Sequence, residues 1–257
     1  MEVPIKKARV FVSLLALLTL SAFGFEKVQT LSLPADGIGK LEITAGAGFL
    51  KVSGQEGLSS IEVRAEIVAS GVRDKDMEDF IKDNVELELR KSGGTAVLVS
   101  DLRGRFFSFF DGDRRINLTV AVPKGMALDI DDGSGEMEVQ NISAGVRIKD
   151  GSGSLRVEKI TGNVRIDDGS GGLVVDGVQG NLDIIDGSGE IEVRNVTGDV
   201  SVDDGSGSTT LFRIGGNVTI DDGSGSLEID DVGKDVRLKH KGSGSTDIRN
   251  VRGTVVK

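Results

Sequence analysis

The chain has 257 residues, of which 38% are hydrophobic, and its formal net charge is −10 at pH 7. This charge argues against nucleic acid as a partner, because nucleic-acid binding depends on neutralising phosphates with basic side chains. The sequence contains no cysteine, which excludes disulfides, thiolate metal sites and a lipid-modified cysteine anchor. Glycine is frequent at 37 residues while proline is limited to 3, a combination that indicates tight turns rather than disorder.

Residues 1–24 are predicted to be a secretory signal peptide. Three basic residues precede the apolar run Val10–Leu20, which has the length of a signal peptide's apolar region and is short for a membrane span. The small residues Ala22 and Gly24 predict cleavage after Gly24. An uncleaved anchor is the alternative. We therefore expect an exported protein, located in the periplasm, on the cell surface or outside the cell.

Residues 25–123 are predicted to form an irregular β-rich segment with one short helix. Met77, Phe80 and Ile81 have helical spacing within Asp74–Asn84, and Asp74 is placed to cap the helix start. Elsewhere in the segment apolar and polar residues alternate, as in half-buried strands. The predicted strands are Val28–Leu33, Leu41–Thr44, Phe49–Ser53, Ile61–Ala69, Val85–Leu89, Ala96–Val99 and Ile116–Val122.

An aromatic and basic cluster lies between the last two of these strands. It holds four of the ten phenylalanines, flanked by four arginines. The favoured interpretation is a loop whose rings fold back over the edge of the β structure. The alternative is an exposed patch that contacts a membrane surface or a protein partner, because adjacent rings on an extended chain point to opposite faces. The cluster, here called the aromatic loop, comprises Arg103, Arg105, Phe106, Phe107, Phe109, Phe110, Arg114 and Arg115.

From Asp132 onward the tetrapeptide Asp-Gly-Ser-Gly recurs every 18 residues. A fixed period of this length indicates stacked supersecondary units. A seventh copy, which starts with Lys241 instead of aspartate, follows after 19 residues. The six regular copies start at Asp132, Asp150, Asp168, Asp186, Asp204 and Asp222.

Apolar residues recur at fixed positions within each repeat. In the second repeat they are Leu155, Val157, Ile160, Val164 and Ile166. The first two and the last two belong to short strands, and the middle one fills the corner between them. Stacking such coils about 4.8 Å apart would bury these rows and place equivalent residues next to one another. An antiparallel meander gives no reason for a strict period. We therefore predict an all-β fold, a parallel β-solenoid (β-helix) of about seven 18-residue coils over residues 124–257, closed by the irregular seventh coil.

In this solenoid the six aspartates form a row with about 5 Å between neighbours, where like charges repel. Calcium would offset the repulsion, because it takes carboxylate and carbonyl ligands in loops. The order of glycine and aspartate differs, however, from that of the calcium-binding repeats-in-toxin coil. The favoured interpretation is that each aspartate accepts hydrogen bonds from the amides of the following Gly and Ser.

No enzyme activity is expected. The sole histidine, His240, lies in the irregular last coil, and six equivalent serines do not form a triad with it. A carbohydrate-active enzyme on a β-helix is a further alternative, but the repeated acids single out no catalytic pair, and the sequence has no Trp or Tyr to stack on sugars. Val174, Ile185 and Phe212 are predicted to be outward and apolar, either as ordinary scatter or as a contact face.

The chain resembles a family of exported bacterial proteins named "putative adhesins", which have β-strand repeats. The resemblance rests on the signal segment, the strands and helix around Asp74–Asn84, the step Val122–Gly125 and runs such as Asp186–Val200. It implies attachment at the cell surface or envelope and provides no catalytic motif. The cytoplasmic, β-helical bactofilins are a weaker likeness, which the signal segment disfavours.

The leading hypothesis is therefore a non-enzymatic, exported scaffold or adhesin-like binding module. Its partner would be a protein or a cell-envelope component, with peripheral membrane contact through the aromatic loop as one form of attachment. A calcium-binding solenoid is the second hypothesis. The sequence assigns no oligomeric state.

Overall fold

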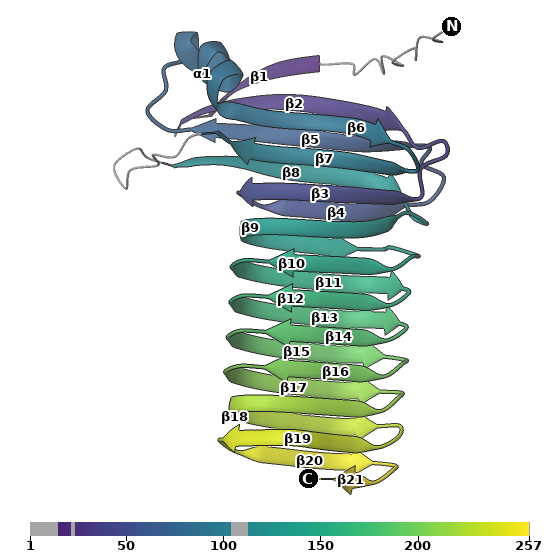
Figure 1. Cartoon of the computed structure of the whole chain (residues 1–257). Coiled ribbons are helices and arrows are strands. Elements are labelled where there is room, and N and C mark those ends of the chain that lie inside the picture. Colours follow the sequence, from purple (N-terminus) through teal and green to yellow (C-terminus); the bar gives the residue numbers. More distant parts are fainter. Residues whose placement is uncertain (1–14, 22–23, 104–112, 257) are drawn as a thin grey trace, which may run out of the picture.

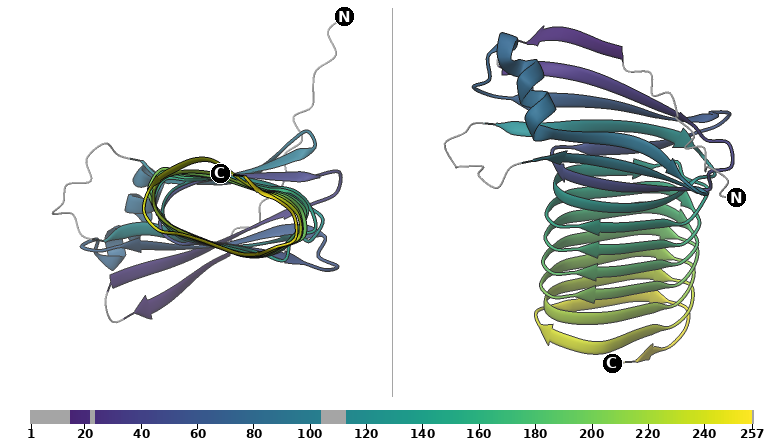
Figure 2. Two further views of the ribbon diagram at one scale, coloured as in Figure 1. Left: turned by 90° about the horizontal axis from the view of Figure 1, so that it is seen from below. Right: turned by 45° about the horizontal axis from the view of Figure 1, so that its top comes forward.

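The repeats build two facing β-sheets. The computed structural model describes residues 15–21, 24–103 and 113–256, with side chains from Lys27 onward. Each coil gives one strand to each sheet, and the coils stack into a column (Figure 1). Seen along its axis, the column is a flattened oval (Figure 2). The predicted all-β parallel solenoid is confirmed.

Within the described residues the first sheet, sheet A, contains twelve strands in the order β1, β2, β5, β8, β4, β9, β11, β13, β15, β17, β18 and β20. Both β9 (Ala127–Gln140) and β18 (Val218–Val232) pass through a Gly-Ser-Gly corner and so belong to both sheets. The others are β1 (Leu15–Ser21), β2 (Gly24–Pro34), β5 (Ser60–Ala69), β8 (Arg114–Pro123), β4 (Leu50–Gln55), β11 (Gly153–Thr161), β13 (Gly171–Gln179), β15 (Gly189–Val196), β17 (Gly207–Ile214) and β20 (Thr246–Val251).

The opposite sheet, sheet B, has the order β6, β7, β3, β9, β10, β12, β14, β16, β18, β19 and β21. Besides β9 and β18 its strands are β6 (Val85–Ser92), β7 (Thr95–Leu102), β3 (Lys40–Ala47), β10 (Val146–Asp150), β12 (Val164–Asp168), β14 (Leu182–Asp186), β16 (Val200–Asp204), β19 (Val236–Ser243) and β21 (Val255–Val256).

The register of the solenoid is parallel and advances by one repeat per coil. In sheet B, Val146 pairs with Val164, which pairs with Leu182 in turn. The predicted inward rows are buried, as Leu155 and Ile166 illustrate. β-Branched residues are frequent in these rows, as strands prefer. In the seventh coil the extra residue shifts the register between β18 and β19 after Ile220.

The glycines at the Gly-Ser-Gly corner are required by the close approach of neighbouring coils. Gly153 has a φ of +139°, and a Cβ on it would lie 1.7 Å from the carbonyl oxygen of Gly135 in the coil before. Gly171 meets Gly153 in the same way. Any side chain here would separate the coils, so the corner repeats with the stack.

The N-terminal segment continues both sheets, but out of sequence order. Strand β3 lies between β7 and β9, and strand β4 lies between β8 and β9. The coil formed by β3 and β4 is therefore inserted between elements that follow it in the chain. Towards the end of the column away from the repeats the pairing becomes antiparallel. In sheet A, β5 pairs with β8 and β2 pairs with β5, and in sheet B β6 pairs with β7.

The predicted helix is present in two parts. A 3₁₀ turn, η1 (Asp74–Asp76), precedes α1 (Met77–Asn84). The expected cap is wrong, because Asp74 lies inside the 3₁₀ turn and neither helix has a side-chain cap hydrogen bond. Met77 is buried, and Ile81 packs against the core.

Part of the predicted signal peptide forms β1, which pairs with β2 alone. Strand β2 pairs with β5 from Phe25 onward, so cleavage after Gly24 would leave that pairing complete. Cleavage stays a prediction. No helix among the described residues has the length and hydrophobicity of a membrane span.

Candidate functional site

The aspartate row faces the interior of the solenoid. Asp150, for example, ends strand β10, and side chains alternate along a strand, so it shares the inward face with Val146 and Ile148. Its exposed fraction is 3%, and that of Asp168 is 1%. All six aspartates of the row are buried. The prediction that the row lies in the turns, based on the glycines that follow each aspartate, is corrected here: the alternation visible in the sequence places the row on the inward face.

The buried carboxylates lack close partners. Both carboxyl oxygens of Asp150, Asp168 and Asp186 are buried without a hydrogen-bond partner. The amides of the following Gly and Ser face the Asp150 carboxyl and favour its charged form, yet they do not reach hydrogen-bonding geometry. Asp204 differs, because its Oδ2 accepts a hydrogen bond of 2.9 Å from the hydroxyl of buried Thr209.

Burial raises the pKa values of the row, because an apolar interior disfavours the charged carboxylate. Burial and the neighbouring Asp150 raise the pKa of Asp132 to about 7. Burial and the charge of Asp168 raise the pKa values of Asp150 and Asp186 to about 6, with Asp204 adding to the effect on Asp186. Asp132, Asp150 and Asp186 therefore take up protons at about pH 6–7, far above the ordinary range of an aspartate.

The row fits calcium poorly. A cation in this row would lie between two neighbouring carboxylates and contact those two. Calcium takes six to eight oxygen ligands. Within the described parts of the chain, no group of three or more metal-binding side chains is placed to hold a metal ion. Calcium binding at Asp132, Asp150, Asp168, Asp186, Asp204 and Asp222 stays a prediction.

Most of the aromatic loop falls beyond the structural description. Phe106, Phe107, Phe109, Phe110 and Arg105 lie outside the described residues. Of the flanking arginines, Arg103 places its Nε 3.1 Å from Glu86 Oε2, and Arg114 lies over the ring of Phe80 at 5.4 Å. Arg115 forms an ion pair with the aspartate two residues before it. These three arginines therefore already interact with other residues of the protein.

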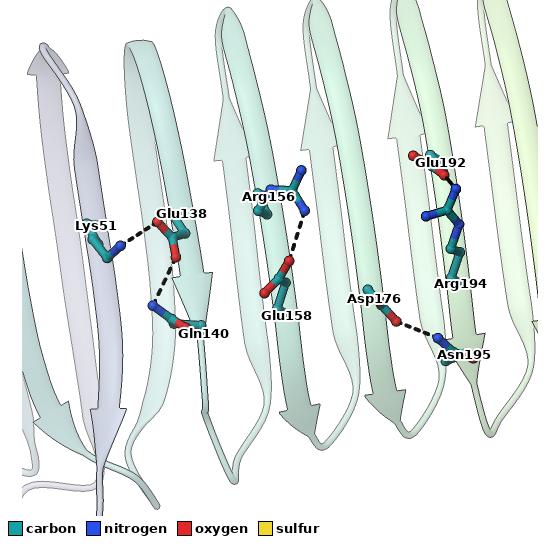
Figure 3. A network of polar contacts seen from close by, with 9 residues as sticks. All are labelled: Lys51, Glu138, Gln140, Arg156, Glu158, Asp176, Glu192, Arg194 and Asn195. Carbon is teal, nitrogen blue, oxygen red and sulfur yellow. Dashed lines mark hydrogen bonds and ion pairs between the residues drawn. The ribbon is translucent and has the colours of Figure 1, made fainter.

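The outer face of sheet A carries charges that are largely paired (Figure 3). Lys51 and Gln140 both contact Glu138, through bonds of 2.7 and 2.9 Å. Arg156 pairs with Glu158 at 2.9 Å. The charged side chains drawn in Figure 3 therefore already have hydrogen-bond or ion-pair partners within this face.

The predicted outward apolar residues do not form one face. Val174 and Phe212 lie on sheet A, whereas Ile185 lies on sheet B and is 37% exposed. The guanidinium of Arg213 covers the Phe212 ring at 4.5 Å. These residues are single apolar positions rather than a contact patch.

A groove of about 870 Å³ runs along the outer face of sheet B. It crosses successive strands, from Lys40 at one end to Arg237 at the other. One wall, the amide wall, is the row Asn163, Asn181, Asp199, Asn217 and Asp235. The other wall, the arginine wall, is the row Asp129, Arg147, Arg165, Asp183, Ser201, Thr219 and Arg237.

Hydrogen bonds between coils fix the amide wall. The Oδ1 of Asn163 accepts the amide N–H of Asn181 at 3.0 Å, and the Oδ1 of Asn181 accepts that of Asp199 at 2.9 Å. Asp199 accepts the amide of Asn217 at 2.7 Å. Each side chain thus binds the backbone of the next coil, so the wall is preformed. The sequence signal is an Asn or Asp directly before the first inward Val or Leu of sheet B in five successive coils, and none of the predictions above rests on it.

On the arginine wall some charges are paired and others are free. The Lys40 ammonium lies 2.8 Å from the Asp129 carboxylate and also bonds Glu42. These two contacts raise the pKa of Lys40. Arg165 pairs with Asp183 at 2.6 Å. Arg147 lies directly beside Arg165 in the sheet. Among the described residues, neither Arg147 nor Arg237 has an ion-pair partner. The groove therefore combines fixed polar groups with free cationic side chains.

Comparison with known proteins gives one family match and several remote structural likenesses. The family model described as Toastrack DUF4097 matches residues 59–250. No match was found among curated protein sequences.

Among solved structures, a "putative adhesin" from Bacteroides fragilis is 13% identical, with a TM-score of 0.45 and coverage of 89% of this chain and 95% of that one. A "putative cell adhesion protein" from Clostridium sporogenes is 14% identical, with a TM-score of 0.34 and coverage of 90% and 97%. A "putative lipid binding protein" from Parabacteroides distasonis is 15% identical, with a TM-score of 0.35 and coverage of 90% and 97%. At these scores and identities, no function is transferred from the three proteins.

Proposed function

The chain belongs to the Toastrack DUF4097 family, and we propose that it is a non-enzymatic, exported, adhesin-like binding module. Its binding surface is the outer face of sheet B, and its partner is a component of the cell envelope. The observation that carries the proposal is the groove, whose amide wall is held in place by hydrogen bonds between coils. A preformed site loses little conformational entropy on binding, which favours recognition by a rigid scaffold.

The pattern of buried and exposed acids supports a binding role over catalysis. A glycosidase needs two carboxylates in different environments across one bond. Here the buried acids form an equivalent row inside the solenoid, away from the outer surface. His240 is exposed on the last coil, with Nδ1 3.0 Å from Asp221 Oδ1. It is the sole histidine of the chain, and the repeated serines offer it no unique nucleophile.

Export follows from the basic and apolar pattern of residues 1–24. It is tested by sequencing the N-terminus of protein recovered from the cell exterior or periplasm, where we expect the chain to start at Phe25. Recovery of full-length chain from the cytoplasm alone would contradict export.

The binding surface is tested by measuring the fraction of protein that sediments with cell envelopes. We expect Arg147→Glu with Arg165→Glu to lower this fraction at least tenfold. The matched control, Arg156→Glu with Arg194→Glu, reverses two outward charges on sheet A and should leave the fraction unchanged. Equal behaviour of the two pairs would exclude the groove.

A third arm tests the aromatic loop, the other predicted contact surface. Phe106→Ser with Phe109→Ser removes two of its rings without changing charge. If this pair abolishes sedimentation while the groove variants do not, the attachment surface is the loop, and membrane contact becomes the favoured mode.

A further inference from the structure

The dimensions of the groove indicate a long and narrow ligand. It spans the strand levels from Lys40 on β3 to Arg237 on β19, seven steps of about 4.8 Å, or roughly 34 Å. Its volume of about 870 Å³ lies towards the upper end of ordinary ligand sites. A ligand that fills it is an extended chain lying along the solenoid axis, across the strands.

The backbone of the groove floor is not available to a peptide strand. Proteins commonly bind extended peptides by adding a strand to a free sheet edge. The floor consists of strands such as β12 and β14, each already paired on both sides. Recognition must therefore come from side chains, which favours a polymer that carries its own hydrogen-bonding groups along its length.

The amide wall presents donors near the middle of the groove, at the starts of the neighbouring strands β12 and β14. The Oδ1 atoms of Asn163 and Asn181 accept backbone N–H groups, which fixes the orientation of both amides. Their NH₂ groups are therefore free to donate towards a ligand. Arg147, on the opposite wall, adds an unpaired guanidinium. This part of the groove favours ligand acceptors, including a negative charge.

The part of the groove from Ser201 to Arg237 has a mixed character. Ser201 and Thr219 contribute hydroxyls, and Asp199 and Asp235 contribute carboxylates that accept hydrogen bonds. Ligand hydroxyl groups satisfy such a surface, whereas a polymer with a negative charge at every unit would be repelled by these acids. Arg237 restores positive charge at the far end. The complementary ligand is rich in hydroxyls and carries separated acidic groups.

We propose that this groove binds an extended glycan whose carboxylates are spaced by neutral sugars. The proposal rests on the proposed function and specifies its ligand class. Arg147 binds a carboxylate, Asn163 and Asn181 donate to ligand acceptors along the next two coils, and the hydroxyl-bearing end binds neutral sugars.

The test is binding of the purified protein to a hyaluronan oligosaccharide long enough to span the groove, which carries a carboxylate on every second sugar. Its carboxyl-reduced form is the matched neutral ligand. Calorimetry should give a measurable Kd for hyaluronan and at least tenfold weaker binding for the reduced form. Equal affinity for the two forms, or no affinity for hyaluronan, would overturn the proposed ligand class.

Two variants assign the binding to the groove. Arg147→Gln should weaken hyaluronan binding at least tenfold, and Arg156→Gln on sheet A should leave it unchanged. Asn163→Asp with Asn181→Asp should also weaken it at least tenfold, because the change replaces two donors by acceptors. This pair preserves the bonds between coils, since Asp199 and Asp235 already make the same bond in the same row. Unchanged affinity in both groove variants would overturn the site.

Failure of this inference is distinguishable from failure of the proposed function. If hyaluronan does not bind but Arg147→Glu with Arg165→Glu still abolishes envelope sedimentation, the function stands and the glycan assignment is wrong. If the groove variants also leave sedimentation unchanged, both are wrong.

Discussion

At the scale of single residues, Thr209 shows what the buried aspartates need. It occupies a core position that is apolar in the other five regular repeats, as Leu155 and Ile191 illustrate. Its hydroxyl donates to Asp204 across the corner and lowers the pKa of that carboxyl, against the effect of burial. One polar residue in an apolar row is therefore explained by the carboxyl beside it.

Replacing Thr209 by valine tests this explanation. Thr209→Val keeps the shape of the side chain but leaves Asp204 Oδ2 without its donor. We expect the free energy of unfolding at pH 7 to fall by about 1–3 kcal/mol, the cost of an unsatisfied buried group. Urea unfolding measures it. Thr210→Val, at the adjacent outward position, is the control and should change stability by less than about 0.5 kcal/mol. Equal effects at the two positions would contradict a specific role for the hydroxyl.

At the scale of the elements, the row of aspartates makes the stability of the solenoid depend on pH. The folded pKa values of Asp132, Asp150 and Asp186 lie above the ordinary value of 3.8. Between the ordinary and the raised pKa the folded state holds more protons than the unfolded state. This contribution to stability is fully present below the ordinary pKa and is lost as the pH rises through about 6–7. Protonated carboxyls are also able to donate hydrogen bonds, which the charged row cannot do.

We expect Asp150→Asn to stabilise the protein at pH 8, because it removes a buried charge and two like-charge contacts. The gain in the free energy of unfolding should be about 1–3 kcal/mol at pH 8 and should shrink towards pH 4.5. Urea unfolding over this pH range measures both. Asp167→Asn changes an exposed acid on the outer face and is the control. A gain that is independent of pH would show that Asp150 is not charged in the folded state at pH 8.

The inward direction of the row also predicts the response to calcium. Because the carboxylates lie in a single file within the core, millimolar calcium should raise the thermal midpoint by less than about 2 °C relative to EDTA. A ligand that bound the folded state tightly would raise it far more, by mass action. Circular dichroism measures the midpoint. A large rise would restore the calcium-binding hypothesis.

At the scale of the whole molecule, the solenoid was predictable because its period repeats inward residues at equivalent positions. The inward direction of Asp150 was also accessible, since it follows Val146 and Ile148 in strict alternation. The position of β3 and β4 in the sheets was not predictable, because those strands lie outside the repeat and pair with elements far away in sequence. The groove walls were not predictable either, because only the stacking of the coils brings Asn163 next to Asn181 and orients their amides.

A stack of equivalent coils should tolerate the removal of one whole coil. Deleting residues 187–204 joins Asp186 to Gly205, so every later residue keeps its sheet, face and neighbours in the row. In a solenoid, stability is approximately a sum over units and their interfaces, so this variant should unfold cooperatively with a smaller urea m-value.

Deleting residues 187–195 removes half a coil and is the matched control. It would move sheet B residues into sheet A positions and break the register of the inward rows, so we expect loss of cooperative unfolding. Far-UV circular dichroism and urea titration distinguish the two variants. Equal tolerance of both deletions would contradict a register set by the 18-residue coil, because only a whole period returns each side chain to its own row.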